Sequence, residues 1–378
     1  MSRRGRRVPG GAALDDAADG AHDEAVRGAL LAWYRRARRD LPWRRTRDPY
    51  AVWVSETMLQ QTRVETVLPY YERFIAELPT VHALAEAPEA RVLALWSGLG
   101  YYRRARMLQA AARRIASEHR GRIPEEPEHL RRLEGVGPYT AGAIASIAFG
   151  RRVPLVDGNV ARVLARLFAV EDDVKSARGK ARLWAIAGRL VAGVDADGGD
   201  WNQALMELGA TVCTPREPAC AACPVRLRCR ALAGGVVRDL PRAAPKRPPR
   251  EVFRTALVLA SGDAVLLARR CKRSLWGGLW EPPGADGVID ALAERLGVDA
   301  GGLRPVGRVV HVLTHRRMHV EVACGALPCR ARWPLPGPEY DGIEPVPWRE
   351  LEALPHSTLA RKVLVVANPP QASLPWKE

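Results

Sequence analysis

Four cysteines clustered past the middle of the chain constrain its fold more than any other feature. Cys213, Cys220, Cys223 and Cys229 are separated by six, two and five residues. One compact loop with this spacing can direct four thiolates to a single centre. Zinc ribbons use two Cys-x-x-Cys pairs on separate knuckles, whereas this segment has one such pair between two single cysteines. We therefore predict a [4Fe–4S] cluster with these four ligands, and keep zinc or unligated thiols as alternatives.

The chain is strongly basic. Its 378 residues include 58 Lys and Arg against 42 Asp and Glu, which gives a formal net charge of +16. Such an excess favours a polyanionic partner, and nucleic acid is the first candidate. No apolar run is long enough for a membrane-spanning helix, and the start, MSRRGRRVPGG, contains no hydrophobic signal core. We expect a cytoplasmic, nucleoid-associated monomer of bacterial type that does not bind membranes.

The sequence pattern changes at a basic, proline-rich stretch. Residues 1–24 show no periodicity and are expected to form a disordered basic tail. Residues 25–235 have apolar side chains at three- and four-residue spacings, which is typical of helices. Residues 236–250, VVRDLPRAAPKRPPR, suit an extended linker, and residues 251–378 alternate short β-branched runs with Gly and Pro turns. We predict a mainly α domain, a linker and a smaller α+β domain.

The segment LEGVGPYTAGAI contains two glycines at a turn. Gly135, Val136 and Gly137 lie between a helix expected to end near Leu133 and another expected to begin near Thr140. Such a turn presents backbone N–H groups and a helix N-terminus to an anion. We interpret it as a helix–hairpin–helix clamp that binds DNA phosphates and recognises shape, although many turns without function share the Gly-x-Gly pattern.

Two acidic residues are candidates for catalysis. Glu56 lies in a segment that Asp48 and Pro49 can start as a helix, and its helical neighbours are largely apolar. Burial there would keep the carboxyl group protonated, as a proton donor requires; the alternative is a glutamate that reaches solvent or pairs with an arginine. Asp157 precedes an arginine-rich helix, which it can cap while it stays ionised. One acid and one anion are the pair used in glycoside-type cleavage.

Five features together resemble the helix–hairpin–helix base-excision glycosylases, specifically the adenine DNA glycosylases of the MutY type. They are SETMLQQT, GLGYYRRA, LEGVGPYTAGAI, VDGNVARV and the cysteine spacing. The resemblance covers nearly the whole chain after the tail. It implies a six-helix barrel with an iron–sulfur cluster subdomain, joined to a Nudix-like domain. It also implies a base-flipping hydrolase that removes adenine opposite 8-oxoguanine, or opposite guanine, in duplex DNA.

The resemblance assigns roles to individual residues. Glu56 would protonate adenine at N7, and Asp157 would stabilise the sugar cation. Tyr139 and Asn159 would support that intermediate and order the catalytic water. Three residues would contact DNA near the lesion: Gln61, Leu99 and Tyr101. Four residues of the segment RRDLPWRR would form the adenine pocket: Arg39, Leu41, Trp43 and Arg44.

Tyr139 distinguishes this family from the most similar alternative family, the endonuclease III type. In that type a lysine at the corresponding hairpin position attacks the sugar and forms a Schiff base. A tyrosine cannot form an imine, so we expect a monofunctional enzyme that leaves an abasic site. Bifunctional cleavage at oxidised pyrimidines stays as one alternative. A non-catalytic iron–sulfur protein that binds distorted DNA is the alternative from another class.

The C-terminal segment resembles a Nudix domain through LWGGLWEPPG, and in this family that domain reads 8-oxoguanine. A Nudix hydrolase needs several glutamates on the next helix to hold Mg²⁺, whereas VIDALAERLG offers only Glu294. We therefore expect recognition without nucleotide hydrolysis, through His311, Thr314 and His315 of HVLTHRR. Leu313 stands where the family often has phenylalanine. Contact with a replication clamp or another repair protein is left open.

Overall fold

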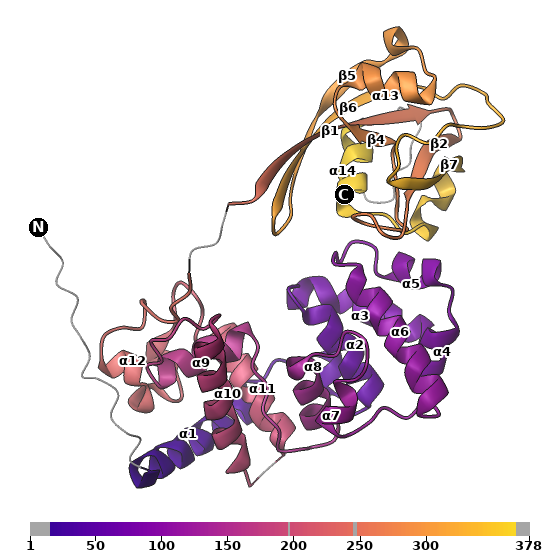
Figure 1. Ribbon diagram of the computed structural model, residues 1–378. Coiled ribbons are helices and arrows are strands. Elements are labelled where there is room, and N and C mark those ends of the chain that lie inside the picture. Colours follow the sequence, from indigo (N-terminus) through magenta and orange to yellow (C-terminus); the bar gives the residue numbers. More distant parts are fainter. Residues whose placement is uncertain (1–15, 196, 245–247, 368–378) are drawn as a thin grey trace, which may run out of the picture. The chain divides into compact units, whose positions relative to one another are not determined.

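The computed structural model describes residues 16–195, 197–244 and 248–367 (Figure 1). Helices dominate the N-terminal part, and a seven-stranded sheet with flanking helices forms the C-terminal part. The expected fold class, a mainly α segment joined to a smaller α+β segment, is confirmed. Within these ranges no helix combines the length and the apolar character that crossing a membrane requires.

Packing divides the chain into two compact units. The first unit comprises Met1–Gln61 with Arg114–Pro245, and the second unit comprises Thr62–Arg113 with Lys246–Glu378. The second unit therefore combines a helical segment with the α+β segment, although the sequence pattern changes between them.

The first unit is helical. Its α-helices are α1 (Asp16–Ala37), α2 (Pro49–Leu59), α7 (Pro127–Leu130), α8 (Pro138–Ala143), α9 (Gly158–Leu167), α10 (Ala177–Ala192), α11 (Gly198–Thr211) and α12 (Arg230–Ala233). Shorter elements join them: 3-10 helices η1 (Pro42–Arg44), η3 (Cys220–Ala222) and η4 (Arg226–Arg228), and the π-helical segment η2 (Ile144–Ala148).

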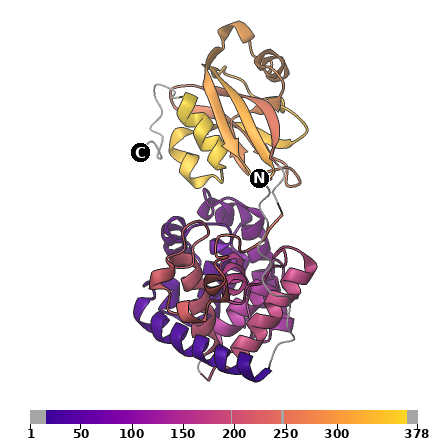
Figure 2. The same ribbon diagram turned by 90° about the vertical axis from the view of Figure 1, so that its left-hand side faces the viewer.

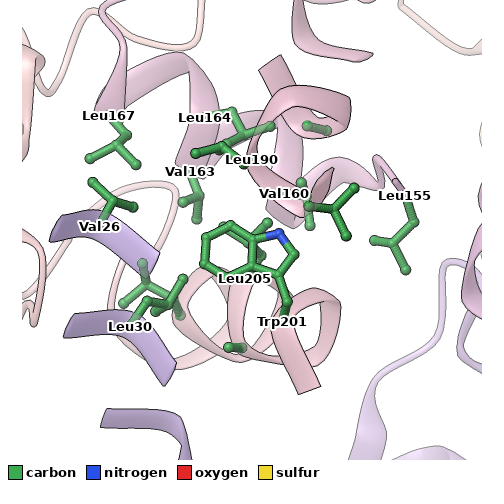
Figure 3. Close-up of a cluster of buried hydrophobic side chains, with 14 of the residues drawn as sticks. Val26, Leu30, Leu155, Val160, Val163, Leu164, Leu167, Leu190, Trp201 and Leu205 are labelled. Carbon is green, nitrogen blue, oxygen red and sulfur yellow. The ribbon is translucent and has the colours of Figure 1, made fainter. Parts of the chain in front are cut away.

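Helix α9 shows how the sequence builds the core of the first unit. Its apolar side chains recur at three- and four-residue spacings and form one face: Val160, Val163, Leu164 and Leu167. That face contacts side chains of α1, α10 and α11 around the buried Trp201 (Figure 3). Burying one such aliphatic side chain stabilises the fold by about 1.5–3 kcal/mol. The apolar face thereby fixes the rotation of α9, and with it the direction of its polar side chains.

The second unit begins with helices. They are α3 (Val64–Glu77), α4 (Val81–Glu86), α5 (Glu89–Leu95) and α6 (Arg103–Glu118), whose C-terminal end passes into the first unit. The sheet strands follow: β1 (Arg250–Ala260), β2 (Ala264–Arg270), β3 (Trp280–Glu281), β4 (Gly284–Asp286), β5 (Arg304–Val312), β6 (Arg316–Ala326) and β7 (Tyr340–Pro347). The strand order is β3-β2-β1-β6-β5, with β4 paired to β1 and β7 paired to β2. The β1 and β6 strands are parallel, and the other pairs are antiparallel.

Two helices cover opposite faces of this sheet. Along β1, Leu257 and Leu259 pack in a core with α13 (Ile289–Leu296), whereas the intervening Val258 packs in a core with α14 (Thr358–Ala367). Successive strand side chains point to opposite faces, so this alternation places the helices on either side. Helix α14 lies along β5 and β6 (Figure 2). Short 3-10 segments, η5 (Ala300–Gly302) and η6 (Trp348–Ala353), complete the unit.

The structure corrects two expectations about local structure. The disordered tail was expected to reach residue 24, but helix α1 begins at Asp16. Within this helix Asp23 is buried and pairs with Arg189 of α10. The rest of that tail, residues 1–15, lies outside the described residues. Helix α14 was not expected, although its buried residues Leu359, Val363, Leu364 and Ala367 recur at helical spacing.

Candidate active site

Glu56 lies inside helix α2 of the first unit. Asp48 caps this helix by accepting hydrogen bonds from the Tyr50 and Ala51 N–H groups at 3.1 and 3.3 Å, and Pro49 occupies its first position. The helix is buried along most of its length, and Glu56 is only 3% exposed. The expected apolar setting of this carboxyl group is therefore confirmed.

Tyr139 meets Glu56 from helix α8. Its hydroxyl group donates a hydrogen bond to Oε2 of Glu56. A second contact joins the same helices, since the Gln60 side-chain amide donates to Oγ1 of Thr140 at 3.2 Å. The end of α2 and the start of α8 are therefore held together at the acid. The family resemblance placed Tyr139 and Glu56 at one site, but neither residue's local sequence indicates the other.

Burial raises the pKa of Glu56, and the nearby Asp157 adds to this effect, while the hydrogen bond from Tyr139 and the charge of Arg44 oppose it; the resulting pKa is about 7. The carboxyl group can thus carry a proton at neutral pH and also lose it. Burial beside two carboxyl groups also raises the pKa of Tyr139 well above its usual value, so that side chain stays a neutral donor. These residues can perform acid–base chemistry.

Asp157 caps helix α9, as its position in the sequence predicts. Its Oδ1 atom accepts the Val160 N–H at 2.7 Å, and its Oδ2 atom accepts the Asn159 side-chain amide at 3.2 Å. Burial raises the pKa of Asp157, whereas these hydrogen bonds and the charge of Arg162 lower it. The expectation of a simply ionised aspartate at a helix start therefore omitted desolvation, which makes its ionised form depend on those donors.

A line of hydrogen bonds connects Asp157 with the cysteine loop. Beyond Asn159, Arg162 donates from Nη2 to the Asn159 Oδ1 atom at 2.8 Å and from Nε to the Cys213 carbonyl oxygen at 2.7 Å. One turn further along α9, Arg166 donates to the carbonyl oxygens of Thr214 and Pro215. The motif NVARVLAR contains both arginines, and their four-residue spacing could have indicated that they share a helix face.

The four clustered cysteines fall in the loop after α11 and are all partly buried. Burial, followed by the neighbouring thiols, raises the pKa of Cys223 to about 11. Arg166 Nη1 lies 3.4 Å from the Cys213 Sγ atom. Thiolate sulfur is the donor type of iron–sulfur clusters, so the donor chemistry fits the expected group. Nowhere in the described residues, however, are three or more His, Cys, Asp or Glu side chains already gathered as a metal-binding group.

The segment expected to form the adenine pocket is held by a residue that the sequence analysis missed. Glu207 of α11 is 1% exposed and accepts from Arg39 Nε at 2.8 Å and Nη2 at 2.9 Å. The same carboxylate accepts from Arg44 Nη2 at 2.8 Å. These arginines lower the pKa of Glu207 to about 2. The other two residues of the segment, Leu41 and Trp43, are buried. Both arginines are therefore held in place, which their sequence does not indicate.

The expected phosphate clamp lies between α7 and α8, but one of its residues has another role. Gly135 adopts the left-handed backbone conformation, with φ of +77°, and Gly137 precedes α8; both are exposed. Val136 is buried, and its N–H donates to the Leu133 carbonyl oxygen at 3.2 Å. That amide closes the turn, so in this conformation the Val136 N–H is already engaged, and phosphate binding by the turn stays a prediction.

The residues expected near a lesion differ in exposure. Gln61, at the end of the first unit's N-terminal segment, is exposed and has φ of +59°. In the second unit Tyr101 is 48% exposed with φ of +50°, whereas Leu99 is 5% exposed. A buried leucine offers no surface to DNA, so Leu99 is a core residue in this structure. The two exposed side chains both sit on left-handed backbone, which is uncommon for residues other than glycine.

The expected 8-oxoguanine-reading residues lie on the β5–β6 hairpin. The turn is closed by the Leu313 N–H, which donates to the Arg316 carbonyl oxygen at 2.7 Å, and Thr314 and His315 are exposed there. The Thr314 Oγ1 atom lies 3.0 Å from the Tyr101 hydroxyl oxygen. His311 lies before the turn, inside strand β5; it is half-buried, and its ring centroid lies 6.0 Å from that of Trp276. Its position inside the strand separates it from the exposed turn.

Comparison with known proteins shows extended similarity. Residues 54–186 match the family of HhH-GPD superfamily base excision DNA repair proteins, and residues 254–365 match the NUDIX domain. The adenine DNA glycosylase of Homo sapiens is 41% identical over 369 residues, covering 80% of this chain and 67% of that protein. The Rattus norvegicus adenine DNA glycosylase is 39% identical over 408 residues, covering 90% and 78%. The structure of a thermostable thymine-DNA glycosylase aligns with a TM-score of 0.52 at 29% identity, covering 57% of this chain and 99% of that one.

Proposed function

The chain belongs to the adenine DNA glycosylase family, and from that premise we propose that it excises adenine opposite 8-oxoguanine by acid-catalysed hydrolysis of the N-glycosidic bond. Family membership makes the protein a DNA N-glycosylase of base-excision repair. The observation that carries the finer proposal is the buried Glu56 carboxyl group, whose pKa of about 7 lets it hold a proton at neutral pH.

Catalysis begins with the target adenine extruded from the duplex, because its glycosidic bond cannot be reached inside the stack. Glu56 then donates its proton to N7 of adenine, and the bond between N9 and C1′ breaks with its electron pair moving to the base. The deoxyribose is left as an oxocarbenium-like cation. The Asp157 carboxylate, held by the Val160 N–H and the Asn159 amide, stabilises that positive charge.

Hydrolysis then completes the cycle. Glu56, now ionised, accepts a proton from water as the oxygen attacks C1′, so the abasic site forms and the acid is regenerated. Tyr139 keeps a hydrogen bond to this carboxylate and, as a phenol, forms no covalent adduct with the sugar. The reaction therefore stops at the abasic site without cutting the DNA strand.

Cys213, Cys220, Cys223 and Cys229 would hold a [4Fe–4S] cluster, which when bound would order the loop that contains them. Arg162 and Arg166 already bind the backbone of this loop through Cys213, Thr214 and Pro215. In purified protein we expect about four irons and four acid-labile sulfides per chain. Zinc without sulfide would overturn this assignment.

The exposed turn with Thr314 and His315 is proposed to read 8-oxoguanine on the opposite strand. Thr314 supplies a hydroxyl group and His315 an imidazole on the surface of the hairpin. His311 is excluded from this proposal, since it is half-buried in β5. The expected effect of Thr314→Val is a smaller preference for adenine opposite 8-oxoguanine over adenine opposite guanine.

One assay tests the proposed function. Single-turnover excision is measured on duplexes with adenine opposite 8-oxoguanine, adenine opposite guanine, and thymine glycol opposite adenine. Excision of adenine, fastest opposite 8-oxoguanine, is the expected result. Release of thymine glycol with strand cleavage, and trapping on DNA by borohydride, would instead indicate the endonuclease III type. Binding without any excision would indicate a non-catalytic DNA-binding protein.

A further inference from the structure

The turn between α5 and α6, Ser97–Tyr102, is strained. Three of its residues occupy left-handed backbone: Gly98 with φ of +109°, Gly100 with +73° and Tyr101 with +50°. A residue other than glycine in that region costs of order 1–3 kcal/mol and persists only when its surroundings hold it. Tyr101 also exposes its large aromatic ring. Some part of the second unit must therefore stabilise this turn.

Part of the support comes from the helical segment itself. Arg104 of α6 donates to the Gly100 carbonyl oxygen at 3.3 Å, and the Trp96 ring nitrogen donates to the same oxygen at 3.2 Å. The Arg104 guanidinium carbon lies 5.3 Å from the centroid of the Tyr101 ring. These contacts hold the middle of the turn, where Tyr101 begins.

The ends of the turn are held from the α+β segment. The buried Ser97 hydroxyl donates to the His356 carbonyl oxygen at 2.8 Å and accepts the His356 N–H at 3.3 Å. The buried Tyr102 hydroxyl donates to the same carbonyl oxygen at 2.7 Å and accepts the Gly98 N–H at 3.0 Å. One backbone position just before α14 thus binds both ends of the turn.

Arg361 of α14 completes this contact. It donates from Nη2 to the Ser97 carbonyl oxygen at 3.2 Å and from Nε to the His356 Nε2 atom at 2.6 Å. The other ring nitrogen of His356, Nδ1, lies 2.7 Å from the Leu354 carbonyl oxygen, to which it can donate only when it carries the proton. The imidazole is then neutral and fixed between an arginine donor and a carbonyl acceptor. The His356 side chain is therefore held on both sides, next to the backbone groups that bind the turn.

We infer that His356 and Arg361 are positioning residues that brace the Ser97–Tyr102 turn, so that Tyr101 presents its ring to DNA only when the Nudix-like segment is packed against the turn. The part that concerns DNA rests on the proposed function, whereas the brace itself rests on the contacts above. The Nudix-like segment would then influence the DNA strand that contains adenine, through Tyr101, as well as the opposite strand that contains 8-oxoguanine. Recognition of the damaged base and extrusion of adenine would be mechanically linked.

The test uses full-length protein and compares two arginines. Each joins the helical segment to the α+β segment, Arg361 from α14 and Arg106 through the loop before β3. Arg361→Met removes the contact with Ser97. Arg106→Met is the matched control, because Arg106 donates to the Gly277 carbonyl oxygen and pairs with Glu89 at 3.0 Å, away from the turn. Tyr102→Phe removes a single oxygen and leaves the ring in the core.

Hydrogen exchange of backbone amides is the first measurement, since it does not depend on activity. Arg361→Met and Tyr102→Phe should accelerate exchange in residues 97–102 about tenfold, and Arg106→Met should leave it within twofold of wild type. Unchanged exchange in both turn variants would overturn the brace. If wild-type protein fails to excise adenine, the proposed function fails, but this measurement still decides the brace.

The second measurement reports extrusion. With 2-aminopurine in place of the target adenine opposite 8-oxoguanine, fluorescence rises when the base leaves the stack. We expect both turn variants to lower this rise and the single-turnover rate about tenfold, with little change for Arg106→Met. Combining Arg361→Met with Tyr102→Phe should cost less than the sum of the single effects, because both act on one turn. Faster exchange with normal extrusion would overturn the link to Tyr101.

Discussion

Glu56 and Glu207 are two glutamates of the first unit that are buried to nearly the same extent, 3% and 1% exposed. Their carboxyl groups nevertheless have opposite ionisation behaviour. Burial, with Asp157 nearby, raises the pKa of Glu56 to about 7, whereas hydrogen bonds from Arg39 and Arg44 lower the pKa of Glu207 to about 2. Desolvation acts on both carboxyl groups, so the partners decide the outcome.

The difference separates a reactive carboxyl group from a structural one. Glu56 faces a phenol and another carboxyl group, so its proton can be given up and regained near neutral pH. Glu207 faces two guanidinium groups, so its carboxylate stays ionised at neutral pH. A buried glutamate is therefore a candidate acid only when no cation that is hydrogen-bonded to it compensates its charge.

The largest expected effect is on chemistry at Glu56. Glu56→Gln keeps the shape and removes the proton donor, so single-turnover excision of adenine should fall by about 10³-fold or more. Affinity for the same duplex, measured by gel shift, should stay within a few-fold of wild type. Loss of binding together with excision would mean that the residue has a structural role and that the comparison with Glu207 is mistaken.

The same replacement should change stability in opposite directions at the two sites. The pKa of Glu56 is about 7 in the folded protein and 4.5 in the unfolded chain, so the fold loses stability as the pH rises from 4.5 through 7. Glu56→Gln removes this ionisation and should therefore stabilise the protein at pH 8 by about 3 kcal/mol. Glu207 contributes stability above pH 4.5 that is lost as the pH falls towards 2, so Glu207→Gln at pH 8 should destabilise by about 3 kcal/mol. Urea unfolding measures both, and changes of equal sign would contradict the assignment.

A smaller effect is expected on the pH profile of excision. The rate should fall as the pH rises through about 7, because Glu56 must be protonated to act. The Tyr139 hydroxyl lowers that pKa, so Tyr139→Phe should move this limb of the profile upward by about one pH unit, whatever it does to the maximal rate. A limb that stays in place would exclude Glu56 as the group that titrates.

The smallest effect is expected at an exposed carboxylate. Asp40 pairs with Arg45 at 2.5 Å, but both side chains are largely in solvent. Water screens such a pair, so Asp40→Asn should leave the urea midpoint and the excision rate unchanged within error. A clear loss of stability would show that ion pairing itself, without burial, explains the behaviour of Glu207.

Much of the local structure was predictable because it depends on neighbouring residues. Asp48 and Asp157 cap their helices as expected, and the β-branched runs became β1, β2, β5 and β6. The strands β3, β4 and β7 were missed, since pairing with a neighbour and not local preference makes them strands. The π-helical segment after α8 likewise has no local signal.

The family resemblance predicted which residues form the site, but not which side chains they contact. Glu56, Tyr139, Asp157 and Asn159 do come together, whereas Leu99 and Val136 are buried and His311 lies away from the hairpin turn. Arg162 and Glu207 were missed, because each is an ordinary helical residue until a distant segment meets it. Burial of a loop leucine depends on what packs over the loop.

The sequence by itself determined the residue types, the helix caps, the cysteine spacing and the change from helical to strand patterning. These are short-range properties, set by backbone conformation and side-chain alternation. Only the tertiary structure decided which carboxyl group holds a proton. Tyr139 lies 83 positions from Glu56, and Arg39 lies 168 positions from Glu207. Ionisation of a buried group depends on the distance to such partners and on the loss of water, and folding sets both.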